Sequence, residues 1–325
     1  MHTLLPEARL EDTSSYPAVA IVGPTGAGKS TLASLLAGRF GAEIVSCDAL
    51  QVYRGMDIGT AKPAPHERRA IPHHMIDLCE PDEDFTAGEY QRRAREVLRA
   101  IRQRGRLPLV VGGTGFYFRA LIEGLFDGPG RSEEIRSRLR RIAERKGPSY
   151  LHARLRRFDP EAAARIAPAD IARTVRACEI YFLSGKTMTW WQRQPRDALQ
   201  GFRWLKLGLS WPRALLYERI DARVEEMFAQ GFVEEVRRLI EKYPRNCHAF
   251  TAIGYRQIIL HLEGRLTLEQ ALRETQKASR RYAKRQLTWF RTDGEIVWLD
   301  AAAGIESAAA QAARLIENFL GRGAA

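Results

Sequence analysis

Apolar residues occur along this chain in two alternating patterns, short unbroken runs and longer stretches with helical spacing. The unbroken runs are typical of strands buried on both faces of a parallel sheet, and they lie at 18–22, 43–46, 107–111, 202–209 and 296–300. Helical spacing marks the stretches 31–37, 86–104, 213–230, 267–291 and 305–320. This order, with few hairpin signals, predicts an α/β fold in which helices cover both faces of a parallel sheet.

One segment departs from this pattern and predicts a second domain. Between 124 and 190 no strand pattern appears, arginines are dense from 131 to 157, and residues 170–183 have helical spacing through Ile171, Val175, Cys178 and Phe182. We therefore expect an all-helical insertion with a basic surface at 125–199. It interrupts a P-loop core made of 17–124 and 200–325, and a disordered leader spans 1–16.

The first strand and the first helix enclose a phosphate-binding motif. Its sequence fits G-x-x-x-x-G-K-[ST] and reads Gly23-Pro24-Thr25-Gly26-Ala27-Gly28-Lys29-Ser30. Glycines allow successive amides to converge on one anion, and the start of the helix adds its positive dipole end. Lys29 is expected to reach the terminal phosphates, and Ser30 to hold Mg²⁺. The motif therefore predicts a ligand with a diphosphate or triphosphate, and alone it suggests ATP.

Two further strand ends carry candidate chemistry. Asp48 follows the strand at 43–46, which places it beside the phosphate loop, either as a reactive group or as an aspartate that orders Mg²⁺. The strand at 107–111 ends in Gly112-Gly113-Thr114, where glycines permit a close approach to a ligand. Most P-loop enzymes that hydrolyse nucleotides have an acidic residue at this strand end. The difference argues against an ordinary ATPase.

Charge and composition indicate the kind of partner. The net charge of +12 and the isoelectric point near 9.8 favour a polyanion, and nucleic acid fits a basic protein with a phosphate site. The four cysteines form no C-x-x-C pair, which fits a reducing cytoplasm. No apolar run approaches the length of a membrane span, and residues 1–15 lack a secretory signal. We expect a cytoplasmic protein, not bound to a membrane.

Several stretches together resemble the tRNA dimethylallyltransferases, also called tRNA isopentenyltransferases. Besides the phosphate loop, the resemblance rests on C-D-A-L-Q-V-Y-R-G-M-D-I-G-T-A-K-P at 47–63, V-G-G-T-G at 111–115, I-G-Y-R-Q at 253–257 and A-K-R-Q-L-T-W-F-R at 283–291. The resemblance implies transfer of a dimethylallyl group from dimethylallyl diphosphate to N6 of the adenosine on the 3′ side of a tRNA anticodon.

The same resemblance implies roles for individual residues. Asp48 matches the general base, Thr114 a residue near the reacting centre, and Arg223 an arginine that grips the pyrophosphate. The tRNA contacts of the family map onto Asp48, Ala49, Leu50, Gln51, Thr114, Arg136, Ala172, Arg173, Thr174, Val175, Arg176, Thr251, Ala252, Ile253, Gly254, Tyr255 and Arg256. Ala49 stands where many relatives have serine, so one hydroxyl beside the base is missing here.

Two other classes of enzyme remain open at this point. A P-loop kinase of a small metabolite or nucleotide would need only the phosphate loop, and an ATPase stimulated by nucleic acid would hydrolyse ATP faster with RNA. The Gly-Gly-Thr strand end, the basic insertion and the 47–63 block favour the prenyltransferase, acting as a monomer.

Overall fold

The computed structural model describes residues 15–321 and divides them into two compact units. The first contains the described residues up to Ile122 and from Leu199 onward, and the second spans Glu123–Ala198. These limits differ by one or two residues from the expected boundaries at 124/125 and 199/200. The expected leader lies outside the described residues apart from Ser15 and Tyr16, and Tyr16 corrects that expectation because it opens the first strand.

The first unit is built on a parallel sheet whose described strands run in the order β3-β2-β4-β1-β5-β6. The five strands that the sequence predicts are all present, as β1 (Tyr16–Val22), β2 (Glu43–Cys47), β4 (Pro108–Gly112), β5 (Phe202–Ser210) and β6 (Val297–Asp300). The short strand β3 (His73–His74) was not predicted. The α/β fold class is thus confirmed.

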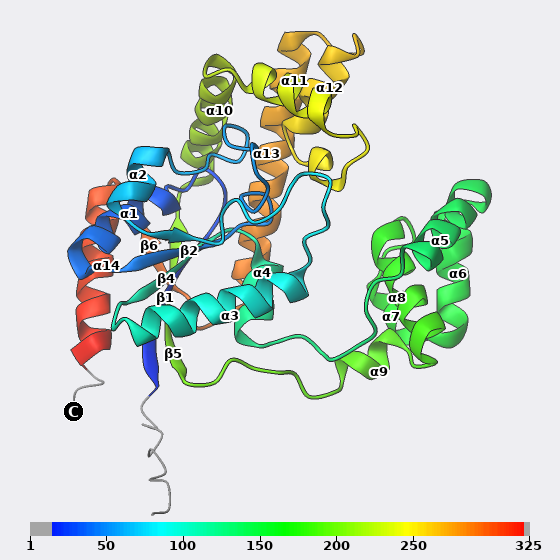
Figure 1. Cartoon of the computed structure of the whole chain (residues 1–325), viewed down its shortest axis with the longest axis horizontal. Helices are drawn as coiled ribbons and strands as arrows, with labels where there is room; N and C mark the ends of the chain where they lie inside the picture. Colours follow the sequence, from blue (N-terminus) through cyan, green and yellow to red (C-terminus); the bar gives the residue numbers. More distant parts are fainter. Residues whose placement is uncertain (1–14, 322–325) are drawn as a thin grey trace, which may run out of the picture. The chain divides into compact units, whose positions relative to one another are not determined.

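Helices cover both faces of this sheet, as Figure 1 shows. One face packs on α1 (Lys29–Phe40), α10 (Arg213–Ala229) and α14 (Ile305–Gly321). The other packs on α3 (Ala87–Gln103) and α4 (Gly115–Ile122). Alternate residues of β1 face opposite sides, with Val19 and Ile21 in the first core and Ala20 and Val22 in the second. The unbroken apolar run of β1 reflects this double burial.

A separate helical cluster adjoins the loops at one end of the sheet. It contains α11 (Phe232–Lys242), η1 (His248–Thr251) and α12 (Tyr255–Leu262), and α12 packs on α13 (Leu268–Phe290). Buried residues of the 50–63 loop, among them Val52, Tyr53 and Met56, join the same core. The loop is therefore ordered, and α2 (Pro65–Ala70) follows it.

The second unit has helices as its regular elements within 123–198. These are α5 (Glu133–Lys146), α6 (Pro148–Phe158), α7 (Pro160–Arg165), α8 (Ile171–Ser184) and α9 (Met188–Gln192). The expected apolar face of α8 is partly wrong, because Ile171 and Phe182 are exposed while Val175 and Cys178 are buried. Helices α5 and α6 pack against α8. Their shared core contains Ala177 as well as Val175 and Cys178, so the buried face of α8 lies on a different side of the helix from Phe182.

Candidate functional site

The phosphate loop has the backbone geometry of an anion cradle. Gly26 and Gly28 have φ angles of 78° and 88°, a region that favours glycine, and Gly28 is the residue that caps the start of α1. A Cβ on Gly26 would lie 2.7 Å from Cγ1 of Ile220, and one on Gly28 would lie 2.6 Å from Cδ1 of Ile305. Conformation and packing therefore both require glycine at these two positions.

The carbonyl groups of this loop are held by side chains of the protein itself. Lys29 Nζ donates to the Pro24 carbonyl at 2.8 Å, Arg219 Nε to Gly26 at 3.0 Å, and Trp211 Nε1 to Ala27 at 3.0 Å. Arg219 also stacks on the Trp211 ring, 4.3 Å from its centroid. Within residues 15–321, the backbone amides of Gly26, Gly28 and Lys29 have no protein acceptor. These three amides are thus available to an anionic ligand.

Three charged side chains interact beside the loop. Burial and the positive charge of Arg223 lower the pKa of Lys29 to about 8, and the negative charge of Asp48 opposes this shift. Burial likewise lowers the pKa of Arg223, again opposed by Asp48. Arg223 Nη1 donates to the Thr25 hydroxyl at 3.4 Å. Two cations and one carboxylate therefore share a site that favours added negative charge.

Asp48 lies at the carboxyl end of β2 with its side chain oriented by its own turn. Oδ1 accepts the backbone amides of Leu50 at 2.8 Å and Gln51 at 3.4 Å. Oδ2 has no hydrogen-bond partner in the part of the chain that the structure describes, so it is available to take a proton. The sequence prediction that Asp48 stands beside the phosphate loop is consistent with its charge interactions with Lys29 and Arg223.

Thr114 joins this edge of the sheet through two contacts. Its Oγ1 accepts the Ala49 amide at 3.1 Å, and the side chain of Tyr282 lies close enough to interact with it. Burial and the negative charge of Asp48 raise the pKa of Tyr282 to about 12, although the interaction with Thr114 works in the opposite direction. The phenol is therefore neutral at physiological pH. The sequence alone did not indicate the position of Tyr282 beside Asp48 and Thr114.

Packing within the protein explains the glycines at and just after the end of β4. A Cβ on Gly112 would lie 2.0 Å from the Cys47 carbonyl oxygen, one on Gly113 would lie 2.1 Å from Gln286 Nε2, and one on Gly115 would lie 2.1 Å from Trp289 Cδ1. The protein's own β2 and α13 occupy this space. Packing within the protein is thus sufficient to require glycine here, and the approach of a ligand to this backbone stays a prediction.

The residues present fit the Mg²⁺ ion expected at Ser30. Ser30 is exposed at the start of α1, next to the free amides of the loop. Residues 15–321 hold no cluster of three histidine, cysteine or acidic side chains that would enclose a metal. Mg²⁺ keeps several waters and commonly binds through one protein ligand plus phosphate oxygens, so a single hydroxyl beside a diphosphate cradle suits it.

The tRNA-contacting residues expected in the first unit differ in exposure. Asp48, Ala49 and Leu50 are partly exposed, as are Ala252 and Ile253, while Thr251 and Arg256 are fully exposed. Gln51 is partly exposed too, but its amide bonds Ser46 Oγ and the Thr60 and Ala61 carbonyls. Gly254 and Tyr255 are buried, and Tyr255 donates its hydroxyl to Glu235. These two residues are therefore covered by the protein in this structure, and their contact with RNA stays a prediction.

In the second unit, α8 carries the expected tRNA-contacting residues. Thr174 and Val175 are buried against the helical core, so their side chains offer no accessible surface to RNA in this structure. Arg136 and Arg176 both pair with the buried Glu179, at 2.9 and 2.7 Å. Ala172 and Arg173 are exposed, and the Arg173 side chain retains 71% of its accessible surface. Arg173 is therefore the more exposed of the two arginines expected on α8, and its contact with Asp170 is long, at 3.4 Å.

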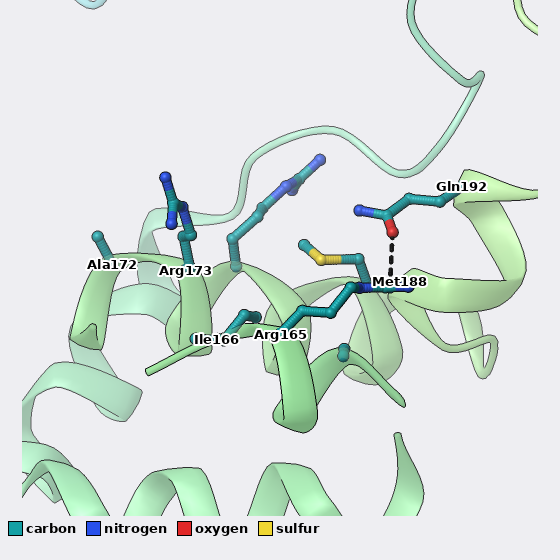
Figure 2. Close-up of a pocket in the computed structure, with 8 residues that line it drawn as sticks. Arg165, Ile166, Ala172, Arg173, Met188 and Gln192 are labelled. Atoms are coloured by element: carbon teal, nitrogen blue, oxygen red, sulfur yellow. Dashed lines mark hydrogen bonds between the residues drawn. The ribbon is translucent and has the colours of Figure 1, made fainter. Parts of the chain in front are cut away.

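A cavity of about 450 Å³ lies beside these residues, between α7, α8 and α9. It is lined by Ala162, Arg165, Ile166, Ala172, Arg173, Arg176, Met188 and Gln192. Figure 2 shows Arg165 joined to Gln192 by a hydrogen bond, 2.9 Å long, on one side of the cavity, and Ala172 and Arg173 on the other. Its polar lining consists of three arginines and one glutamine, so the cavity suits an anionic or hydrogen-bonding group.

A phosphate-binding loop at the carboxyl edge of a parallel sheet, with a carboxylate beside it, defines a P-loop α/β protein. A family model described as IPP transferase matches residues 51–293. The chain is 53% identical over 279 residues to a tRNA dimethylallyltransferase of Koribacter versatilis, covering 86% of this chain and 91% of that protein. It is 47% identical over 307 residues to the one of Solibacter usitatus, covering 94% and 100%.

Solved structures agree with these matches. A tRNA isopentenylpyrophosphate transferase of Bacillus halodurans superposes with a TM-score of 0.71 at 38% identity, covering 95% of this chain and 98% of that one. A eukaryotic dimethylallyltransferase acting on tRNA gives a TM-score of 0.77 at 28% identity, covering 95% and 80%. The chain belongs to the tRNA dimethylallyltransferase family of enzymes. The resemblance found in the sequence is confirmed.

Within residues 15–321, no helix combines the length and the apolar character that a membrane crossing requires.

Proposed function

We propose that this protein transfers a dimethylallyl group from dimethylallyl diphosphate to N6 of the adenosine on the 3′ side of a tRNA anticodon, and releases diphosphate. The observation that carries the proposal is the grouping of Asp48 with Lys29 and Arg223 beside the free amides of the phosphate loop. A cradle for a leaving diphosphate and a base for an incoming amine thus share one site.

The donor half of the site stabilises the leaving group. When the C1–O bond of the allylic donor breaks, the bonding electrons stay on the diphosphate, whose growing charge needs nearby donors. The loop amides, Lys29 and Arg223 supply them. Mg²⁺ held by Ser30, when bound, neutralises part of the same charge. Because the carbonyls of the loop are bonded to Lys29, Arg219 and Trp211, its amides need little rearrangement as charge develops.

The acceptor half of the site removes a proton. The exocyclic amine of adenine forms a bond to C1 of the allyl group and must lose one N–H proton. Asp48 Oδ2 is the acceptor for that proton, while Oδ1 stays bonded to Leu50 and Gln51. Thr114 and Tyr282 line the same edge and offer hydroxyl groups to the base. The adenosine has to leave its stack to reach Asp48, which costs least in a loop.

The tRNA itself binds through basic surface on both units. Arg173 and the cavity beside it fit phosphate and base groups of the RNA, and Thr251, Ala252, Ile253 and Arg256 supply accessible contacts on the first unit. A monomer working in the cytoplasm, where tRNA is found, is part of this proposal. Family membership and the absence of an acidic residue after β4 favour the transferase over the kinase alternative.

One experiment tests the reaction directly. The purified protein is incubated with Mg²⁺, unmodified tRNA and dimethylallyl diphosphate labelled in the allyl group, and the tRNA is then digested to nucleosides. We expect label in N6-dimethylallyladenosine, and no label when the tRNA carries another base at that position. Label that stays entirely in the donor would refute the proposal, and so would rapid ATP hydrolysis stimulated by tRNA in place of transfer.

A further inference from the structure

One glutamine of α13 connects the two halves of the site. Gln286 has only 6% of its surface exposed. Its Oε1 accepts the backbone amide of Thr25 at 2.8 Å, and its Nε2 donates to the Gly113 carbonyl at 2.9 Å. Both polar atoms of the side chain are thus bonded to backbone groups of the protein.

The two backbone groups belong to different halves of the site. Thr25 lies in the phosphate loop, and its hydroxyl also receives the bond from Arg223. Gly113 precedes Thr114, which holds the amide of Ala49 next to Asp48. One turn before Gln286 on the same helix, Tyr282 lies near Thr114 and Asp48. The helix therefore fixes the loop that holds the donor and the strand end that presents the acceptor base.

The packing around Gln286 leaves little freedom. A Cβ on Gly113 would lie 2.1 Å from Nε2, so the amide approaches the Gly113 backbone as closely as glycine permits. A side chain shorter by one methylene could not reach both Thr25 and Gly113. An acid at this position could accept from Thr25 but, when ionised, could not donate to the Gly113 carbonyl.

We propose that Gln286 is a positioning residue that sets the separation between the diphosphate cradle and the Asp48–Thr114 edge. The inference rests on the proposed prenyl transfer and adds to it a residue that touches neither substrate. Reactions between two bound partners depend steeply on their separation, and a misplacement of about 1 Å costs on the order of 100-fold in rate. Loss of the bridge should therefore lower kcat more than it weakens the binding of either substrate.

The test compares Gln286→Glu, Gln286→Leu and the control Gln270→Glu. Gln270 lies on the same helix, is exposed and accepts a backbone amide in a capping box, which glutamate also does. At pH 8 we expect Gln286→Glu to lower kcat roughly 10- to 100-fold, with the KM of each substrate changed less than threefold. The kcat of Gln270→Glu should match that of the wild-type protein.

The pH profile separates positioning from simple damage. Burial at this position raises the pKa of an introduced glutamic acid, and the protonated acid donates a hydrogen bond. The kcat of Gln286→Glu relative to wild type should therefore recover as pH falls from 8 towards 6, whereas Gln286→Leu should show no recovery. Gln286→Asn keeps both polar groups but is too short, so its kcat should be as low as that of Gln286→Leu. If Gln286→Glu fails to fold, Gln286→Asn takes its place in the comparison of kcat with KM.

Three outcomes would overturn the inference: wild-type kcat in the Gln286 variants, a defect confined to KM, or parallel pH profiles for the acid and the leucine. The wild-type protein is assayed alongside. Its inactivity would count against the prenyl transfer itself, while an active wild type with unaffected variants would refute only the role of Gln286.

Discussion

Lys29 has the most finely balanced charge in the site. Its ammonium group is destabilised by burial and by Arg223, and it is stabilised by Asp48. A bound diphosphate would tip this balance towards the protonated form, because it places negative charge where the amides of Gly26, Gly28 and Lys29 converge. The same negative charge compensates Arg223. The buried cations Lys29 and Arg223 repel each other, so a negatively charged ligand should stabilise the donor site.

This balance predicts a pH dependence of diphosphate binding. Because the pKa of Lys29 is about 8 instead of 10.5, the lysine loses its proton as pH rises through 8, and the affinity for pyrophosphate should fall over that range. Below pH 7 the affinity should vary little from this cause. Calorimetric titration with magnesium pyrophosphate from pH 6.5 to 9.5 measures it. Lys29→Arg, which stays protonated, should lose this part of the pH dependence, and an identical profile in both proteins would contradict the argument.

Substitution of Asp48 tests the base. Asp48→Asn keeps the size and the acceptor oxygen for the amides of Leu50 and Gln51, but it cannot take up the adenine proton. Prenyl transfer should fall about 10²- to 10⁴-fold, the usual contribution of general base catalysis. Binding of tRNA, measured by filter retention, should stay within threefold. Transfer at the wild-type rate would exclude Asp48 as the base.

At the scale of elements, the 50–63 loop depends on one buried acid of α11. Glu235 is 3% exposed and accepts the backbone amides of Asp57, Ile58 and Gly59, as well as the hydroxyl of Tyr255. Four donors converge on one carboxylate. The 50–63 loop is thus fixed by α11, which lies far along the sequence. Three of the loop's backbone amides bond the carboxylate and do not need a partner strand.

Glu235→Gln should therefore loosen this loop. A neutral amide weakens the charge-assisted bonds and turns its NH₂ group towards backbone donors, so the free energy of unfolding should fall by about 2–3 kcal/mol. Urea denaturation measures the change, and faster proteolysis within 50–63 would locate it. Glu234→Gln is the matched control, because Glu234 is an exposed neighbour paired only with Arg237 among the described residues. Equal stability of the two variants would show that Glu235 does not hold the loop.

At the scale of the whole molecule, the excess of positive charge is a property of both units. The net charge of +12 comes with many ion pairs inside the structure, and several arginines of the second unit are bonded to acids. Binding of tRNA should depend on those cations that are not held in this way. Of the two arginines expected to contact tRNA from α8, Arg173 is the less strongly held, since its contact with Asp170 is long, at 3.4 Å, and its side chain is largely exposed.

Arg173→Gln should weaken tRNA binding and make it less sensitive to salt. Each phosphate contact contributes about 0.9 to the slope of log affinity against log salt concentration for a duplex, so the slope should decrease by about one. Fluorescence anisotropy with labelled tRNA between 50 and 300 mM KCl measures it. Arg314→Gln on the exposed side of α14 removes the same charge and should leave the slope unchanged. An unaltered slope in Arg173→Gln would show that this arginine is a solvated surface residue without a phosphate contact.

Much of the fold was readable from local pattern. The predicted strands around the phosphate loop are all present, because residues buried on two faces leave unbroken apolar runs of characteristic length. β3, α2, α4 and α11 were not predicted. The first is only His73 and His74, whose rings bond the Ile71 carbonyl and Glu43, and so carries no apolar run. The outer face of α8 was misjudged, because spacing alone does not say which side its neighbours cover.

The sequence by itself determined the phosphate loop, the position of Asp48 beyond β2 and the family, because each is written in consecutive residues whose chemistry is local. Only the tertiary structure decided which residues hold that loop. Trp211, Arg219 and Gln286 come from β5–α10 and α13, and they contact Ala27, Gly26 and Thr25 across more than 180 positions. Such bonds depend on how helices pack against the edge of the sheet, and the local pattern of residues along the sequence does not specify that packing.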